Sequence, residues 1–348
     1  MNKPVNKPVN KPVIQTADDA RAAAAEFNAL HSRIKTQVSR MVVGQTEIID
    51  GVLTALLAGG HVLLEGVPGL GKTLLVRSLG EALHLKFSRI QFTPDMMPAD
   101  IQGTSVLIES QGGGHELVFQ EGPLMANMVL ADEINRATPK TQSALLEAMQ
   151  ERQITLGKRT MKLDEPFCVM ATQNPIEQEG TYPLPEAQLD RFLLKLVVGY
   201  PREEDYHGIL ERTTGFDAAR IEPVSNGEEI LNMRKIVRSV PVPEHAQTYA
   251  IRLIIGTQPG GPYAPQIVND YVALGSSPRG AQGLILAAKV RALLDGRFAV
   301  SADDLRAMAL PVMRHRIVVN FQGQAEGVTA DRIVTELLSC LKPPHGVG

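Results

Sequence analysis

The stretch that decides the fold is His61-Val-Leu-Leu-Glu-Gly-Val-Pro-Gly-Leu-Gly-Lys-Thr73. A short apolar run, His61 to Leu64, leads into glycine-rich sequence, and a helical pattern continues from Lys72 to Leu85. Glycines let backbone N–H groups wrap an anion without Cβ clashes, and the helix that follows turns its positive end toward that anion. The stretch therefore predicts a phosphate-binding strand–loop–helix unit.

Residues Gly66 to Thr73 match the P-loop pattern GxxxxGK[ST] completely. Lys72 is expected to reach the β- and γ-phosphates of ATP, and Thr73 to offer its hydroxyl to Mg²⁺. The strand before the motif and the helix after it are the context that distinguishes a P-loop from a chance glycine turn. The predicted nucleotide contacts are Gly66, Val67, Pro68, Gly69, Leu70, Gly71, Lys72, Thr73 and Leu74.

A second motif, Met128-Val-Leu-Ala-Asp132-Glu133, is an apolar run that ends in two acids. Alone, such a run is more often a strand that meets a solvated turn, but beside a P-loop it predicts a catalytic strand. Asp132 would hold Mg²⁺ directly or through water, and Glu133 would polarise the attacking water as a general base.

Asn174 directly follows the apolar run Phe167 to Thr172. If that run is a central strand, Asn174 lies at its carboxyl end, where ligands of parallel sheets bind. It could then orient the attacking water. An Asn-Pro turn with Pro175 is the structural alternative, and the two interpretations are compatible.

Short apolar runs alternate with helical segments over the first part of the chain, which predicts a mostly parallel sheet covered on both faces. The other strands are expected at Arg89–Phe92, Asn127–Ala131 and Phe192–Val198. After Pro201 the strand signals fade, and helices are expected at Glu203–Arg212, Gly227–Val237, Glu244–Thr257, Arg279–Asp295 and Asp303–Met313. We therefore expect a tail (1–17), an α/β core (18–201) and a helical domain (202–348).

Two hairpins interrupt the core pattern. The first pairs Ser105–Glu109 with Glu116–Gln120, and the second pairs Ile154–Leu156 with Arg159–Leu163. Gly157–Lys158 is a two-residue turn with glycine first, as a type II′ hairpin requires. The hairpins are expected to project as functional loops; the alternative is that they only cover sheet edges.

The composition is that of a globular chain of 348 residues with a net charge of −3, which argues against nucleic acid as the main partner. Two cysteines, Cys168 and Cys340, give no zinc pattern and fit a reducing cytoplasm. No apolar run reaches the roughly 20 residues that span a bilayer. Residues 2–13 repeat Asn-Lys-Pro-Val and are expected to be a disordered tether or a partner-binding arm.

In this order, these motifs resemble the core of an AAA+ ATPase. The exact residues in and around the motifs resemble those of the MoxR family. The matching stretches are Gly60 to Thr73, Ala131-Asp-Glu-Ile-Asn-Arg-Ala137, Ala171-Thr-Gln-Asn-Pro175 and Leu184-Pro-Glu-Ala-Gln-Leu-Asp-Arg-Phe192. The resemblance implies an α/β P-loop AAA+ core with a parallel five-stranded sheet and a small helical lid, and ATP bound between core and lid.

The resemblance also implies roles for single residues. Asn174 resembles sensor 1. Arg191 resembles the arginine finger that one subunit supplies to the nucleotide site of its neighbour. At that γ-phosphate it would neutralise charge that develops in the transition state. An ion pair of Arg191 with Asp190 or Glu186 is the structural alternative.

Arg279 resembles sensor 2 on the lid, acting in its own subunit or in a neighbour. Arg136 could also reach across a subunit interface. The hairpins resemble inserts that approach a ring's central pore, where Lys158, Arg159 and Lys162 could bind an acidic surface or simply face solvent. The segment that packs on the adenine is expected to comprise Val43, Gly44 and Gln45.

The resemblance implies an ATPase that forms a homo-oligomeric, hexameric ring and acts as a chaperone in remodelling, maturation or metal insertion. The implied client carries a von Willebrand factor A domain. Three alternatives stay open: a motor on nucleic acid, a chelatase motor subunit, and a nucleotide switch without turnover. The presence of Glu133, Asn174 and Arg191 argues against the switch, because binding alone needs none of them.

Overall fold

The computed structural model describes residues 14, 16–67, 69–109, 115–156, 159–174, 180–214 and 220–344. Its centre is a five-stranded sheet in the order β2-β5-β8-β1-β9, and all four neighbouring pairs are parallel. The predicted parallel five-stranded sheet is thus confirmed. Its strands are β1 (Val62–Glu65), β2 (Phe87–Gln91), β5 (Met128–Asp132), β8 (Cys168–Gln173) and β9 (Leu194–Val197).

Alternate residues of these strands enter two separate cores, because successive side chains of a strand point to opposite faces. Val62 and Leu64 join one apolar cluster, whereas Leu63 joins the other. The first cluster is covered by α1 (Ala17–Ser39), α2 (Thr46–Ala58) and α3 (Lys72–Ala82), and the second by α5 (Pro139–Glu151). Both faces of the sheet are therefore buried, which explains the near-continuous apolar runs in the sequence.

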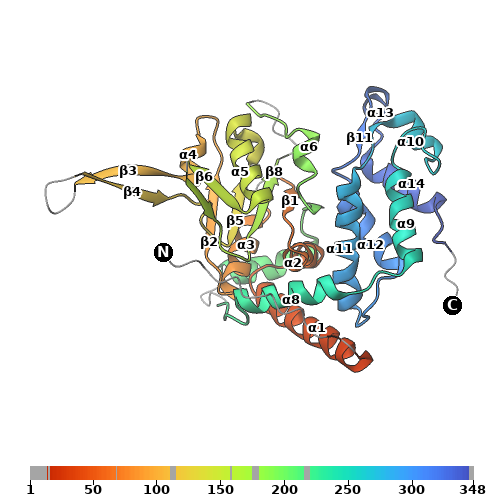
Figure 1. Cartoon of the computed structure of the whole chain (residues 1–348), viewed down its shortest axis with the longest axis horizontal. Helices are drawn as coiled ribbons and strands as arrows, with labels where there is room; N and C mark the ends of the chain where they lie inside the picture. The colour runs from red at the N-terminus through yellow and green to blue at the C-terminus, as the bar shows by residue number, and fades with distance from the viewer. Residues whose placement is uncertain are drawn as a thin grey trace.

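Beyond β9 the chain is mainly helical, and most of these helices form a body beside the sheet (Figure 1). Helix α8 instead lies along α1 and α2 at the base of the core (Figure 1). The helices are α7 (Glu203–Thr214), α8 (Gly227–Ser239), α9 (Glu244–Ile255), α10 (Gln266–Tyr271), α11 (Pro278–Leu294), α12 (Ala302–Met313), α13 (Phe321–Ala325) and α14 (Ala330–Cys340). A two-stranded sheet of β10 (Val272–Leu274) and β11 (Val318–Val319), which the sequence did not predict, joins this body.

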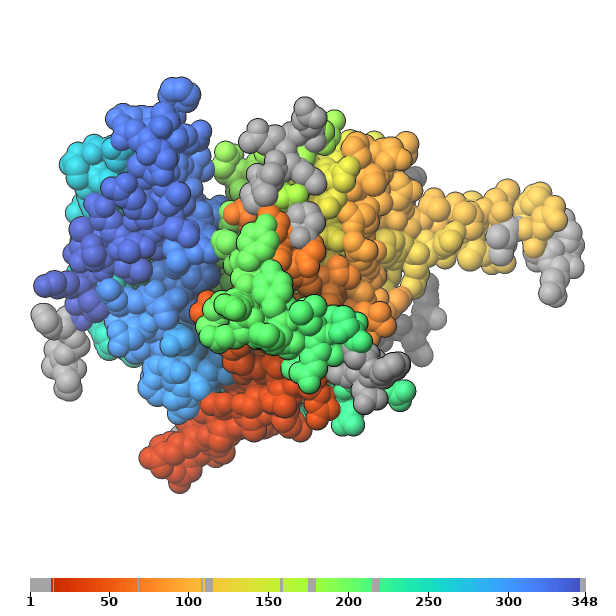
Figure 2. All heavy atoms as spheres, turned by 180° about the vertical axis from the view of Figure 1, so that it is seen from behind, coloured from red at the N-terminus to blue at the C-terminus, as the bar shows by residue number. Residues whose placement is uncertain are grey.

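The two predicted hairpins are present as separate two-stranded sheets. Strands β3 (Gly103–Glu109) and β4 (His115–Glu121) project far beyond the body of the molecule, in the front view and from behind (Figures 1 and 2). Strands β6 (Gln153–Leu156) and β7 (Arg159–Lys162) lie on the core, because one face packs against the second apolar cluster. The turn residue Lys158 and residues 2–13 of the tail lie outside the described residues.

Some local expectations need correction. Strand β2 begins two residues before the predicted Arg89, since Phe87 and Ser88 already pair with β5. Thr138-Pro139 predicts a helix start with Thr138 as its cap; Thr138 does occupy the N-cap of α5 but makes no capping hydrogen bond, and its hydroxyl lies 3.3 Å from that of Thr141. Short helices α4 (Pro98–Gln102) and α6 (Glu186–Leu189) were not predicted. Within the described residues, no helix has the length and apolarity needed to cross a bilayer.

His61, at the entrance to β1, joins three elements of the core. Its Nδ1 accepts a hydrogen bond from the backbone N–H of Val169 at 3.0 Å, so its Nε2 carries the proton and donates to the carbonyl of Met149 at 3.1 Å. Burial lowers the pKa of His61 from 6.5 to about 4, the largest of several effects. The side chain is therefore held neutral as a bridge between β8 and the end of α5.

We predict that this histidine makes the protein acid-sensitive. Above pH 6.5 it is neutral in both states; between pH 6.5 and 4 only the unfolded chain binds the proton, so acid lowers the free energy of unfolding. The loss is about 3 kcal/mol. Denaturant unfolding at pH 7 and pH 5 should show a smaller pH dependence in His61→Asn, which keeps an acceptor and a donor. Equal pH dependence in both proteins would contradict this.

Candidate nucleotide-binding site

The P-loop leaves the carboxyl end of β1 and enters α3 at Lys72. Gly69 and Gly71 have φ of 86° and 73°, a left-handed conformation that residues with a Cβ rarely adopt. A Cβ at Gly66 would lie 2.6 Å from the carbonyl oxygen of Val198, so β9 also requires glycine there. These three positions explain the glycine pattern of the motif; Pro68 lies outside the described residues.

The loop borders a cavity of about 370 Å³ at the carboxyl ends of the parallel strands. Its walls come from the P-loop and α3, and from the ends of β2, β5 and β8. The described lining residues are Gly66, Gly69, Leu70, Gly71, Lys72, Thr73, Leu74, Arg89, Gln91, Asp132, Glu133, Thr172, Gln173 and Asn174. The predicted sites from Gly66 to Leu74, Asp132, Glu133 and Asn174 are thus brought together, apart from Val67 and Pro68.

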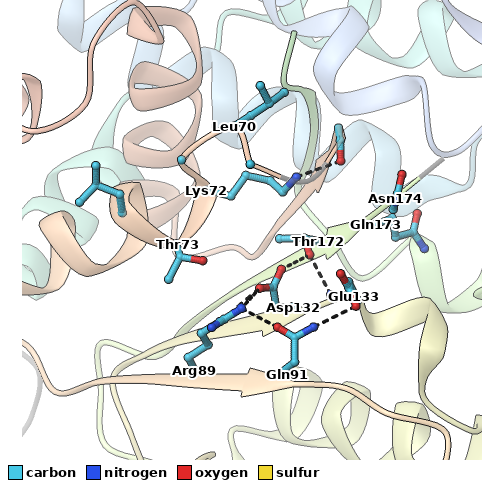
Figure 3. Close-up of a pocket in the computed structure, with 14 residues that line it drawn as sticks. Leu70, Lys72, Thr73, Arg89, Gln91, Asp132, Glu133, Thr172, Gln173 and Asn174 are labelled. Carbon is cyan, nitrogen blue, oxygen red and sulfur yellow. Dashed lines mark hydrogen bonds and ion pairs between the residues drawn. The ribbon is translucent and has the colours of Figure 1, made fainter. Parts of the chain in front are cut away.

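The ammonium of Lys72 lies inside the loop. Its Nζ donates to the carbonyl oxygen of Gly66 at 2.9 Å (Figure 3) and to that of Val67 at 2.8 Å. Burial lowers the pKa of Lys72, and the charges of Asp132 and Glu133 oppose that shift. The cation therefore sits beside the amides that would hold a phosphate, and it can exchange two carbonyl partners for phosphate oxygens.

Thr172, at the end of β8, connects the two acids that follow β5. Its hydroxyl donates to Asp132 Oδ1 at 2.6 Å and accepts the backbone N–H of Glu133 at 2.8 Å (Figure 3). Glu133 has a left-handed backbone with φ of 57°, which is uncommon for a residue with a side chain. The buried hydroxyl therefore fixes the carboxylate of Asp132 and the turn that aims Glu133 into the cavity.

Two residues of β2, Arg89 and Gln91, complete this network, and sequence reasoning missed both. Arg89 donates to Asp132 Oδ2 through Nε at 3.2 Å and through its terminal nitrogen at 2.7 Å, and it also bonds Gln91 Oε1 (Figure 3). Gln91 then donates to Glu133 Oε2 at 2.9 Å. Only the pairing of β2 with β5, which sets Gln91 opposite Asp132, brings these side chains to the acids.

Asp132 and Thr73 both line the cavity with oxygen atoms, and oxygen is the ligand type that Mg²⁺ prefers. No group of three or more His, Cys, Asp or Glu side chains suited to a metal occurs in the described part of the chain. The residues nevertheless fit Mg²⁺, which is usually held by one or two protein oxygens together with water and substrate phosphates.

Arg191 and Arg279 do not line this cavity. They face a second one, of about 250 Å³, which Gly60 and His61 also line. Strand β1 runs from His61 to the P-loop, and its four residues span about 13 Å. The two predicted arginines therefore lie at the amino ends of the strands, opposite the P-loop.

The described part of the structure does not contain the ion pair that was the structural alternative to a finger role for Arg191. Among the described residues it forms no ion pair with Asp190 or Glu186; Asp190 pairs with Arg316 instead, at 2.7 Å. The Nε of Arg191 is buried without a hydrogen-bond partner. Burial, followed by the nearby charge of Arg279, lowers the pKa of Arg191.

The lid contributes no residue to the described lining of the P-loop cavity. The expectation that ATP lies between the core and the helical domain stays a prediction, and on the phosphate side the described lining comes from the core alone. The reason is the docking of the lid: α11 packs on α1 and α2, and its N-terminus with Arg279 points to the far end of the sheet.

The comparisons agree with this architecture. Residues 61–194 match the ATPase family associated with various cellular activities, and residues 264–337 match the AAA lid domain. The chaperone MoxR1 of Mycobacterium tuberculosis is 41% identical over 326 residues, which cover 94% of this chain and 85% of that protein. The chain belongs to the MoxR family of AAA+ ATPases.

Other MoxR relatives cover similar shares. Protein MoxR of Methylorubrum extorquens is 33% identical over 86% of this chain and 88% of its own length. The uncharacterised protein YeaC of Bacillus subtilis is 42% identical over 92% and 96%. A solved structure of a candidate ATPase from Cytophaga hutchinsonii superposes with a TM-score of 0.87 at 38% identity, covering 94% of this chain and 99% of that one.

The remaining predicted sites of this MoxR chain have clear neighbours. Gln45 Nε2 donates to the carbonyl of Leu70 at 2.7 Å, which ties the segment with Val43 and Gly44 to the P-loop. Its contact with adenine stays a prediction. Arg136 pairs with Glu133 Oε2 of its own chain at 3.0 Å, so a contact across an interface would have to compete with that pair.

We predict that Thr172→Val slows ATP turnover and leaves nucleotide affinity unchanged. The substitution removes the hydroxyl from Asp132 and from the N–H of Glu133, so the base is misplaced while the P-loop is intact. A displacement near 1 Å costs on the order of 100-fold in rate. Steady-state kcat and nucleotide titration measure the two effects. Thr172→Ser keeps the hydroxyl and is the matched control; equal loss in both variants would refute the role.

Proposed function

We propose that this MoxR-family chain hydrolyses ATP to ADP and phosphate at sites shared between subunits. The observation that carries the proposal is the separation of two half-sites on one sheet. Lys72, Asp132 and Glu133 line the cavity at the carboxyl ends, whereas Arg191 and Arg279 line the cavity at the amino ends. Neither half contains all the groups that phosphoryl transfer uses.

The first half would bind the substrate and activate water. Loop amides and Lys72 hold the phosphates, and Glu133 accepts the proton of the attacking water. Mg²⁺ held by Thr73 and Asp132 would neutralise phosphate charge as it develops. Asn174, from the end of β8, would orient the water. Gln91 and Arg136 hold Glu133 Oε2, and this leaves the other carboxylate oxygen as the proton acceptor.

The second half would complete the site in trans. A head-to-tail contact would set the amino-end face of one subunit against the carboxyl-end face of the next, and such heterologous contacts form a ring when the rotation between subunits closes. Arg191 and Arg279 would then meet the γ-phosphate of the neighbour. The buried Nε of Arg191, which has no hydrogen-bond partner among the described residues, supports this, because a phosphate oxygen of the neighbour could accept from it. We propose a hexamer, the stoichiometry that the family resemblance implies.

The work done with ATP is proposed to be chaperone-like remodelling of a protein client. A relative of this chain bears the name chaperone MoxR1. The projecting β3–β4 hairpin exposes Leu107 and Leu117, which are cross-strand partners and 62% exposed, as an apolar grip for such a client. A von Willebrand factor A domain in the client, the cytoplasmic location and the domain division at residue 201 stay predictions. A chelatase motor subunit or a nucleic-acid motor is the alternative.

We predict that substitutions in the first half separate binding from turnover. Lys72→Ala should lose ATP binding, because it removes the cation inside the loop. Glu133→Gln should bind ATP normally and not turn it over, because the amide cannot accept the proton. Fluorescent-nucleotide titration and phosphate release measure the two effects, and DNA or RNA in the assay tests the alternative motor. Full turnover by Glu133→Gln would remove Glu133 from the mechanism.

We also predict that Arg191→Ala binds ATP but hydrolyses it slowly, and that mixing restores activity. Glu133→Gln subunits supply an intact Arg191, and Arg191→Ala subunits supply an intact Glu133. In a random 1:1 ring about a quarter of the sites pair the two, so the mixture should reach about a quarter of the wild-type rate. Specific activity of the wild type should also fall on dilution. A mixture no faster than its parents would contradict a shared site.

A further inference from the structure

Arg316, which follows α12, is a lid residue whose guanidinium reaches into the core. The residue is 7% exposed, and it is the buried partner of Asp190. Asp190 directly precedes Arg191 in the chain. The lid and the segment that carries the predicted finger are thus joined through a desolvated ion pair.

All five N–H donors of Arg316 are used. Nε donates to Asp190 Oδ1 at 2.7 Å. One terminal nitrogen donates to the carbonyls of Asp190 at 3.2 Å and Phe192 at 2.6 Å; the other donates to the carbonyls of Leu193 at 3.2 Å and of Val312 in the preceding helix α12. Three carbonyls therefore hold residues 190–193 in one backbone conformation around Arg191, with geometry that only a guanidinium can match.

The second carboxylate oxygen of Asp190 reaches the helix that carries Arg279. Ser277 Oγ donates to it at 2.7 Å, and the same hydroxyl caps α11 by accepting the N–H of Arg279. The Arg279 guanidinium lies 4.0 Å from this oxygen. One carboxylate thus fixes both the backbone next to Arg191 and the start of the helix that bears Arg279.

The contacts of Asp190 with Arg316 and Ser277 hold two cations beside each other in a partly buried cavity. Arg191 and Arg279 line the same cavity. Because the two charges repel each other, the charge of Arg279 lowers the pKa of Arg191. Holding them together has a use when a polyanion of the neighbour, such as a triphosphate, enters between them.

We propose that Arg316 is a positioning residue for ATP hydrolysis: it fixes Arg191 and couples it to Arg279 and the lid, so that both cations are presented to the neighbour as one unit. The inference rests on the proposed shared site. Arg316 itself touches no substrate. When the lid moves, residues 190–193 move with it, because four hydrogen bonds from Arg316 join them to the segment that follows α12.

The test is Arg316→Lys, which keeps the charge and loses most of the carbonyl contacts. Its own P-loop cavity is intact, so nucleotide affinity should stay at the wild-type value. The rate should fall on the order of 10- to 100-fold, as expected for misplaced charge stabilisation in trans. Mixing with Glu133→Gln should restore the rate toward that of the Arg191→Ala mixture, since Glu133→Gln subunits provide correctly held arginines.

Arg297→Lys is the matched control. Arg297 also bonds a lid carboxylate, Asp304, at 2.6 Å, but it contacts no residue of 190–193 among the described residues. It should share any loss of thermal stability with Arg316→Lys and retain turnover. If both variants lose turnover equally, or if Glu133→Gln fails to rescue Arg316→Lys while rescuing Arg191→Ala, the positioning role is wrong and the shared site stands. If neither is rescued, the proposed function itself fails.

Asp190→Asn covers the case in which Arg316→Lys does not fold. The amide keeps an acceptor for Arg316 and loses the charge that draws Ser277 and Arg279 together, so a smaller loss of kcat with unchanged nucleotide affinity is expected. The same mixing experiment applies. Turnover at the wild-type rate in Asp190→Asn, or a loss that mixing does not restore, would overturn the proposal.

Discussion

The five strands of the sheet all run in one direction, and this single constraint divides the chemistry of the molecule. Polar residues that follow the strands collect at one edge, where β1, β5 and β8 deliver the P-loop, Asp132 and Asn174. Residues that precede a strand collect at the other edge, and Arg191 is one of them, just before β9. Because a rigid, two-sided core holds the edges apart, one chain cannot bring both sets to the same phosphate.

Like charges are grouped at each edge of the sheet, and different interactions offset their repulsion at the two edges. At the carboxyl edge, Asp132 and Glu133 are compensated within the chain by Arg89, Gln91 and Arg136. At the amino edge, Asp190 is matched by Arg316, and Arg191 has no partner for its buried Nε among the described residues. Both acids at the carboxyl edge therefore have partners within the chain, whereas the Nε of Arg191 would gain an acceptor if an anion entered the second cavity. That difference favours an assembly in which the neighbour's nucleotide supplies the missing acceptor.

Features made by residues close together in the sequence could be predicted, and features made by distant residues could not. The P-loop and the strand with Asp132 are local patterns, and the parallel sheet follows from alternating apolar runs. Arg89, Gln91 and Thr172 depend on which strands are neighbours, and no local pattern contains that order. Arg316 and Asp190 are 126 positions apart in the sequence and meet only in the folded protein. No local sequence pattern could therefore predict their contact. The role of Asn174 follows from its place after a predicted strand, whereas the roles of Arg191 and Arg279 came from family resemblance; the structure adds where all three lie.

The docking of the lid then decides how a nucleotide could act on the rest of the molecule. A lid that covered its own P-loop could respond to its own ATP, but here the lid grips residues 190–193 and contributes no described residue to that cavity. Opening the grip would leave a buried guanidinium and several carbonyls unpaired, at a cost of several kcal/mol. The lid and residues 190–193 therefore behave as one rigid piece. In the proposed ring, a change at one subunit's γ-phosphate would therefore act first on Arg191 and the lid of its neighbour, and only afterwards within the subunit that holds the nucleotide.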